Sequence, residues 1–133
     1  MKMLLEDENK AQRQVDDFEV IEKSLRDLKS YGPSSFAILT NPDGDFIQVA
    51  GGRVTCVLEH RRLSDDHPKR AYLSTKKVPF EGTQTLMFGG GHMQMEPDEI
   101  LFVDDVVEAF RSFFKSEDFP GSLLWRSMSS RLS

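Results

Sequence analysis

The chain has little cysteine, and this limits the sites that it can build. Its 133 residues include one cysteine, Cys56. A chain with a single cysteine forms no internal disulfide and no cysteine-based zinc site, and this composition is typical of a reducing cytoplasm. Cys56 lies within an apolar run, where a thiol is more often a small buried hydrophobic group than a nucleophile. The sequence therefore predicts a cytoplasmic protein without a disulfide framework.

Long hydrophobic runs are also lacking. No segment approaches the roughly 20 apolar residues that a membrane-spanning helix needs. The first residues, MKMLLEDENK, hold two adjacent leucines before acidic residues begin, which is not the pattern of a signal peptide. We therefore expect no membrane partner. With 38% hydrophobic residues, a chain of this length supports one globular domain with a single core.

Positive charge is in deficit, and the formal net charge is −5 at pH 7. Residues 53–79 are the exception, with seven Lys or Arg against three Asp or Glu. An acidic balance argues against direct binding of nucleic acid, because phosphate contacts need a basic surface. It suits a protein that binds a basic protein, although mild acidity also serves simply to keep a cytoplasmic protein in solution.

Motifs of catalysis are absent as well. Gly89, Gly90 and Gly91, followed by His92, most invite an active-site interpretation. However, they lack the spacing and the following helix of a dinucleotide fingerprint, and no Lys-Ser/Thr pair makes a phosphate loop. The three histidines form no i, i+4 pair, so we expect no metal site and no cofactor. We predict a turn or bulge at a strand end here. A small enzyme that uses this loop and His92 remains the alternative.

Two segments have the periodicity of amphipathic helices. The clearer one spans residues 104–114, with Asp104 or Asp105 as its cap and one apolar stripe; the stripe consists of Val106, Val107, Phe110, Phe113 and Phe114. The other begins near Asp16, which with Glu19 has the spacing of a capping box. Residues 32–33, Gly-Pro, are predicted to end it.

Several short apolar runs predict strands. Residues 35–40 and 45–50 flank the turn sequence Asn-Pro-Asp-Gly, and residues 54–60 follow two glycines, which favours an antiparallel meander. In the third strand, Val54, Cys56 and Leu58 are expected to face the core while Val57 faces outward. Further strands are predicted over residues 71–74, 83–88 and 122–126. The fold class is therefore α+β: one antiparallel sheet of five to six strands with both amphipathic helices packed on one face.

The domain limits follow from the same patterns. Residues 1–15 are polar without sustained periodicity and are predicted to be a flexible lead-in. Residues 16–127 form the single domain, and residues 128–133 are expected to be a loose tail.

The C-terminal part of the chain has a recognisable order of features. Apolar residues 100–103 precede the capped helix 104–114, then come Phe119 and Pro120, and an apolar strand ends in Trp125. This order resembles the C-terminal signature of the first-numbered immunity protein family of bacterial polymorphic-toxin and contact-dependent inhibition systems. The resemblance is good over residues 83–127 and looser over residues 18–60.

The resemblance implies a binding function. An immunity protein of this kind neutralises a cognate toxin C-terminal domain, often a nuclease or a deaminase, and we expect it to occlude the toxin's active site or substrate groove. It implies no catalytic residues, and an interaction module unrelated to toxins remains open. From their charge and adaptability we select seven candidate contact residues: Asp65, Asp66, Met93, Met95, Glu96, Asp98 and Glu99. The basic segment 61–77 is an alternative contact surface.

Overall fold

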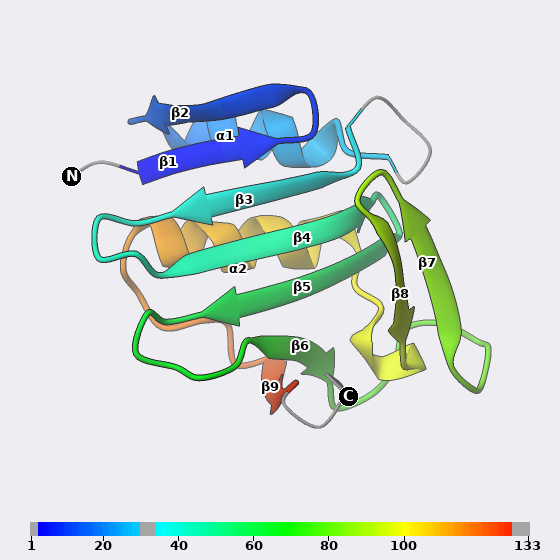
Figure 1. Cartoon of the computed structure of the whole chain (residues 1–133). Helices are drawn as coiled ribbons and strands as arrows, with labels where there is room; N and C mark the ends of the chain where they lie inside the picture. Colours follow the sequence, from blue (N-terminus) through cyan, green and yellow to red (C-terminus); the bar gives the residue numbers. More distant parts are fainter. Residues whose placement is uncertain (1–2, 30–33, 129–133) are drawn as a thin grey trace.

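A large antiparallel sheet forms the body of the protein. The computed structural model describes residues 3–29 and 34–128. Seven strands follow the order β2-β1-β3-β4-β5-β6-β9 (Figure 1). They are β1 (Met3–Asp7), β2 (Lys10–Val15), β3 (Phe36–Thr40), β4 (Phe46–Gly52), β5 (Thr55–Arg61), β6 (Lys69–Leu73) and β9 (Leu123–Ser127). The predicted α+β class and antiparallel sheet are confirmed, whereas the predicted five to six strands are too few.

The first two strands correct the prediction of a flexible lead-in. In β1, Met3 and Leu5 are buried, and Val15 of β2 is buried opposite Met3. The carboxylate of Asp7 accepts hydrogen bonds from the backbone N–H groups of Asn9 and Lys10, which closes the turn between the strands. Residues 3–15 are thus part of the sheet and its core.

The predicted loose tail overlaps the described structure at one residue. Met128 is buried, and its backbone N–H donates to the Pro68 carbonyl at 3.1 Å. Met128 therefore belongs to the folded body, and residues 129–133 lie outside the described residues.

The strands β3 to β5 form the predicted meander, but two of their residues were predicted on the wrong side. The side-chain oxygen of Asn41 accepts from the backbone N–H groups of Asp43 and Asp45 and shapes the expected turn. Val54 was expected in the core but is 62% exposed, because it lies in the turn before β5. Val57 was expected to face water but is buried, because a second layer covers that side of the sheet.

Both helices pack on one face of the sheet, as predicted (Figure 1). Helix α1 (Phe18–Arg26) begins after Asp17, whose carboxylate accepts from the Glu19 N–H, so the cap is Asp17 and not Asp16. The predicted helix end at residues 32–33 lies outside the described residues, and α1 already ends at Arg26. Helix α2 (Val103–Phe114) begins after Phe102, so neither Asp104 nor Asp105 is the N-cap residue that the sequence predicted. Asp105 lies in the first turn, where its carboxylate accepts from the Phe102 N–H at 3.1 Å.

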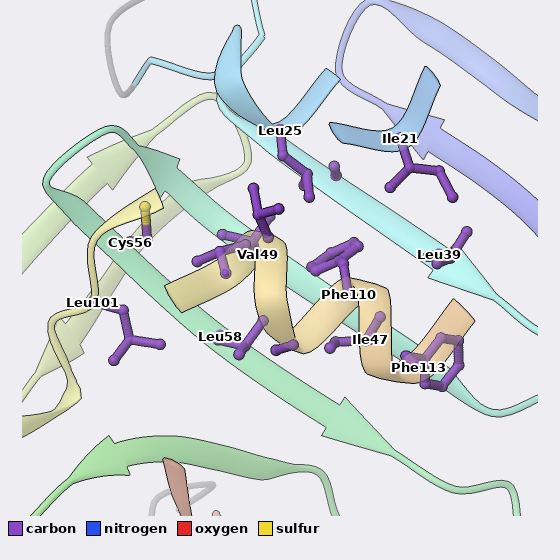
Figure 2. Packing of buried hydrophobic residues seen from close by; sticks show 14 of the residues in the cluster. Ile21, Leu25, Leu39, Ile47, Val49, Cys56, Leu58, Leu101, Phe110 and Phe113 are labelled. Carbon is purple, nitrogen blue, oxygen red and sulfur yellow. The ribbon is translucent and has the colours of Figure 1, made fainter. Parts of the chain in front are cut away.

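The main core lies between the helices and the sheet. Figure 2 shows Ile21 and Leu25 of α1 and Phe110 and Phe113 of α2 gathered against the strands. Each fully buried side chain of this kind contributes about 1.5–3 kcal/mol relative to an exposed one. The amphipathic stripes that the sequence indicates are therefore the faces that the helices bury.

A separate hairpin covers part of the opposite face. Strands β7 (Gln84–Phe88) and β8 (Gly91–Met95) form their own two-stranded sheet, and the 3-10 helix η1 (Pro97–Glu99) follows. Figure 1 shows the hairpin at the end of the sheet where β4 turns into β5. Beneath it lies a second, smaller apolar cluster; its buried members are Ala50, Val57, Leu86, Met95 and Ile100. The hairpin thus divides this face into a covered and an uncovered part.

Candidate functional site

We define the open face as the face of the seven-stranded sheet that is turned away from α1 and α2. Residues directly opposite each other in an antiparallel ladder point to the same side of the sheet. One row of such pairs crosses six strands; it consists of Glu6, Ile38, Gln48, Glu59, Arg70 and Arg126. This cross-sheet row carries an apolar side chain, Ile38, between charged groups toward its two ends. The open face therefore has an apolar part with charged residues on either side of it.

An apolar groove lies where the open face meets the hairpin. Its volume is about 170 Å³. The sheet contributes Phe36, Ile38, Gln48, Val49, Ala50, Val57 and Glu59 to the lining, and the hairpin contributes Phe88, Gly90 and Met93. The Phe36 and Phe88 rings meet edge to face with centroids 6.4 Å apart, which ties the hairpin to β3. Gln48 and Glu59 are the polar members of an otherwise apolar surface.

A cluster of buried charges fixes the hairpin beside this groove. Arg70 pairs with Glu59 at 2.8 Å and with Glu99 at 3.2 Å, and it also donates to the Gln94 carbonyl of β8 at 2.7 Å. Glu99 is fully buried and binds Arg126 at 2.7 Å as well. A buried charge is tolerated only where partners replace water, and these side chains supply them.

The same cluster ends at the surface. Arg126 makes a second ion pair with Asp98 at 3.2 Å and lies 4.2 Å from the centroid of the Tyr72 ring. We call Glu59, Arg70, Asp98, Glu99 and Arg126 the ionic cluster. Its carboxylates outnumber its guanidinium groups, so it leaves the region slightly acidic.

The triple glycine forms the turn of the hairpin, as predicted, and its contacts are structural. The backbone N–H of Gly89 donates to the Ser35 hydroxyl at 2.8 Å, and that hydroxyl donates to Glu8 at 2.6 Å. A side chain at residue 89 would collide with the Glu8 carboxylate. Glycine here therefore permits the close approach of the turn to β3 and to the β1–β2 turn.

His92 stands apart from the groove. It is exposed on β8, and its cross-strand partner is Met87, which is also exposed. Among residues 3–29 and 34–128, no three His, Cys, Asp or Glu side chains are grouped so that they would hold a metal ion.

Cys56 is buried, as the sequence indicates. Burial raises the pKa of its thiol to about 12, and the charge of Asp105 contributes in the same direction. The thiol therefore stays protonated at neutral pH, and a protonated thiol is a poor nucleophile.

The candidate contact residues fall in two separate places. Met93 lines the groove, Asp98 pairs with Arg126, and Glu96 accepts a hydrogen bond from the Thr83 hydroxyl at 3.0 Å. Asp65 and Asp66 lie in the β5–β6 loop, at the other end of the sheet in Figure 1. The seven residues therefore do not form one patch.

Two of these candidates are corrected by their burial. Met95 is 3% exposed and belongs to the apolar cluster beneath the hairpin, and Glu99 is 0% exposed within the ionic cluster. Neither presents a surface to a partner. Both instead hold the hairpin and η1 in place, because hydrophobic and ionic partners enclose them.

Apart from Met93, sequence reasoning missed the side chains that make the groove. Phe36 and Ile38 alternate in β3 with Ala37 and Leu39, which pack in the main core. An uninterrupted apolar run within a strand indicates that both faces avoid water. The four-residue run FAIL in β3 was therefore the available signal for a second apolar surface.

A second hollow surrounds His60 on the helix side of the sheet. The His60 ring lies 4.9 Å from the Phe119 ring and 5.8 Å from Trp125, measured between centroids. Burial is the main cause that lowers the pKa of His60; Arg62 lowers it further, whereas Asp45 opposes the change. Asp65 lines the same hollow. His60 is therefore a packed core group that favours its neutral form.

None of the helices within residues 3–29 and 34–128 is long and apolar enough to cross a membrane. No protein-family model matches this chain, and no curated protein matches it.

Proposed function

We propose that this chain is an immunity protein that binds and neutralises a cognate toxin domain. The observation that carries the proposal is the apolar groove on the open face, whose lining includes the aromatic side chains Phe36 and Phe88 and the side chain of Met93. Protein interfaces are enriched in aromatic residues, Met and Arg at their centres. The resemblance of residues 83–127 to the immunity signature supplies the class of partner.

The charge of the chain supports a basic partner. With a net charge of −5, it attracts proteins of opposite sign and speeds their association. Toxins that act on nucleic acid, such as nucleases and deaminases, need a basic substrate groove. The proposed mechanism is occlusion: the open face covers that groove or the active site and keeps the substrate out.

A test begins with the partner. Tagged chain is purified from the cells that produce it naturally, and the co-purifying proteins are identified by mass spectrometry. We expect a stoichiometric toxin C-terminal domain, whose activity on RNA, DNA or a nucleobase is abolished by an equimolar amount of the purified chain.

Two results would overturn the proposal. A co-purifying domain whose activity is unchanged in the complex contradicts neutralisation. A catalytic activity of the chain alone, lost on His92→Ala substitution, would favour an enzyme that uses the glycine turn.

A further inference from the structure

We infer that the groove receives one large apolar side chain of the partner, and that this side chain is flanked on the partner by Lys or Arg. The inference rests on the proposed function and names the chemistry of the contact. It follows from three properties of the groove: its size, its neighbouring charges and its rigidity.

The size of the groove matches one side chain. Its volume is about 170 Å³. A cavity of about 150 Å³ accepts a benzene molecule, whereas sites for cofactors and other larger ligands measure about 300–1,000 Å³. A Phe, Leu or Met side chain therefore fits, and the apolar lining of Phe36, Ile38 and Phe88 removes it from water.

The charges beside the groove select a basic neighbour for that side chain. In the cross-sheet row, Ile38 and Gln48 lie between Glu6 and Glu59. Glu59 is shared with Arg70 in the ionic cluster, but Glu6 forms no ion pair within residues 3–29 and 34–128. A cation close to the groove therefore meets a carboxylate whose charge is not already balanced nearby.

The spacing of the strands gives the register of the partner segment. Neighbouring strands are about 4.8 Å apart, so Glu6 lies about one strand spacing from Ile38. An extended chain advances about 3.3–3.6 Å per residue. The basic residue is therefore expected within two positions of the apolar anchor.

The walls of the groove are held before any partner arrives. Arg70 ties β8 to the sheet through the Gln94 carbonyl, and Ser35 ties the glycine turn to β3. A preformed site avoids the cost of ordering its walls on binding, which is about 0.5–1.5 kcal/mol for each side chain that must be immobilised. One inserted side chain therefore contributes most of its burial energy to affinity, as hot-spot residues do.

The test uses a phage-displayed library of random dodecapeptides, selected against the immobilised full chain. We expect enriched peptides to share an aromatic residue, Leu or Met with Lys or Arg within two positions. Binding of a synthetic peptide of that sequence is then measured by fluorescence anisotropy.

Variants of the chain locate the site. Ile38→Asp is expected to weaken binding of the peptide at least tenfold, and Glu6→Gln several-fold, with the latter effect shrinking as salt is added. Val20→Asp is the control, because Val20 is exposed on α1 in the other layer and should leave binding unchanged. If Ile38→Asp fails to fold by circular dichroism, Met93→Lys at the hairpin wall takes its place.

Several outcomes would overturn the inference. They are failure to enrich any peptide, a consensus without basic residues, binding that is insensitive to the groove variants, and a dimer in sedimentation whose formation is abolished by Ile38→Asp. The last would mean that a second copy of the chain fills the groove.

The inference and the proposed function fail in different ways. A toxin that the Ile38→Asp chain still neutralises fully refutes the groove while the immunity function stands. A selected basic peptide that binds the groove, in a chain that neutralises no co-purified toxin, refutes the function while the groove stands.

Discussion

The contact with Glu8 restricts residue 89 to glycine. A Cβ atom there would overlap the Glu8 carboxylate, which also accepts from the backbone N–H of Ser35 at 2.8 Å. We predict that Gly89→Ala displaces Glu8 and destabilises the fold by about 1–3 kcal/mol, because hydrogen bonds to a charged group are lost. Urea denaturation measures the difference.

The control for this substitution is another glycine in a turn. A Cβ at Gly121 meets no atom within 4 Å, and its backbone is not in the left-handed region. Gly121→Ala should be neutral or stabilise by up to about 1 kcal/mol, since alanine restricts the unfolded chain. Equal destabilisation by both variants would contradict the assigned role of Gly89.

His60 links the stability of the core to pH. Burial lowers the pKa of the folded-state imidazole below the usual 6.5, so the unfolded chain binds more protons as the pH falls. The contribution of the neutral, buried His60 to the free energy of unfolding is fully present above pH 6.5, and it is lost as the pH falls toward the folded-state pKa. One proton limits the slope to about 1.4 kcal/mol per pH unit.

The measurement is urea denaturation between pH 7.5 and 5. We predict that His60→Gln removes this part of the pH dependence, whereas His67→Gln, in the exposed β5–β6 loop, leaves it unchanged. A wild-type chain that is more stable at pH 5 than at pH 7.5 would show that the charged groups around the ring, Asp45 and Asp65 among them, outweigh burial.

At the scale of elements, the hairpin β7–β8 depends on Arg70. Replacing Arg70 by Met removes the ion-pair partner of Glu59, which keeps its hydrogen bond from Gln48, and one partner of the buried Glu99, together with the hydrogen bond to β8. Loss of one member of a buried pair costs about 3–5 kcal/mol. We predict destabilisation of that size in thermal unfolding, with faster hydrogen exchange in β7 and β8 than in the strands of the seven-stranded sheet.

The matched control is an arginine in a surface network. Arg26 pairs with Glu22 and with the exposed Asp104, both at 2.9 Å. Arg26→Met is expected to cost far less stability than Arg70→Met, because exposed ion pairs contribute little. If the two variants lose equal stability, the ionic cluster is not what holds the hairpin.

The elements that sequence reasoning identified are those with local signals. The β3–β4 hairpin and α2 were predicted because turn residues and a 3.6-residue period lie within the segments themselves. The strands β1 and β2 were missed because their polar, charged composition suggests no core, and pairing with β3 is what buries Leu5.

The site was harder to predict than the fold. Phe36 and Phe88 belong to separate sheets, and only the position of the hairpin on the open face brings them together. Arg70 was read as part of a basic segment, yet Glu59 and Glu99 enclose it. Such long-range ion pairs leave no periodicity in the sequence, whereas the uninterrupted apolar residues of β3 did carry a signal.

At the scale of the whole molecule, the first two strands complete the core. Met3, Leu5 and Val15 are each no more than 7% exposed. Together their burial amounts to roughly 5–9 kcal/mol, which is comparable with the total stability of a small domain. We predict that a chain beginning at Asp16 shows no cooperative thermal transition by circular dichroism.

A point substitution on the same strand provides the control. Gln14 is exposed on β2, so Gln14→Ala should change the free energy of unfolding by no more than about 0.5 kcal/mol. A shortened chain with full cooperativity would restore the view that residues 1–15 are a dispensable lead-in.

The position of the hairpin outside the seven-stranded sheet has a consequence for how such a protein changes its specificity. One wall of the groove comes from the β7–β8 hairpin, whereas the main core comes from the larger sheet and the two helices. New side chains at Phe88 or Met93 therefore reshape the recognition surface without repacking that core. The hairpin is in effect an exchangeable module, and grafting a different hairpin between β6 and η1 offers a direct way to retarget the scaffold.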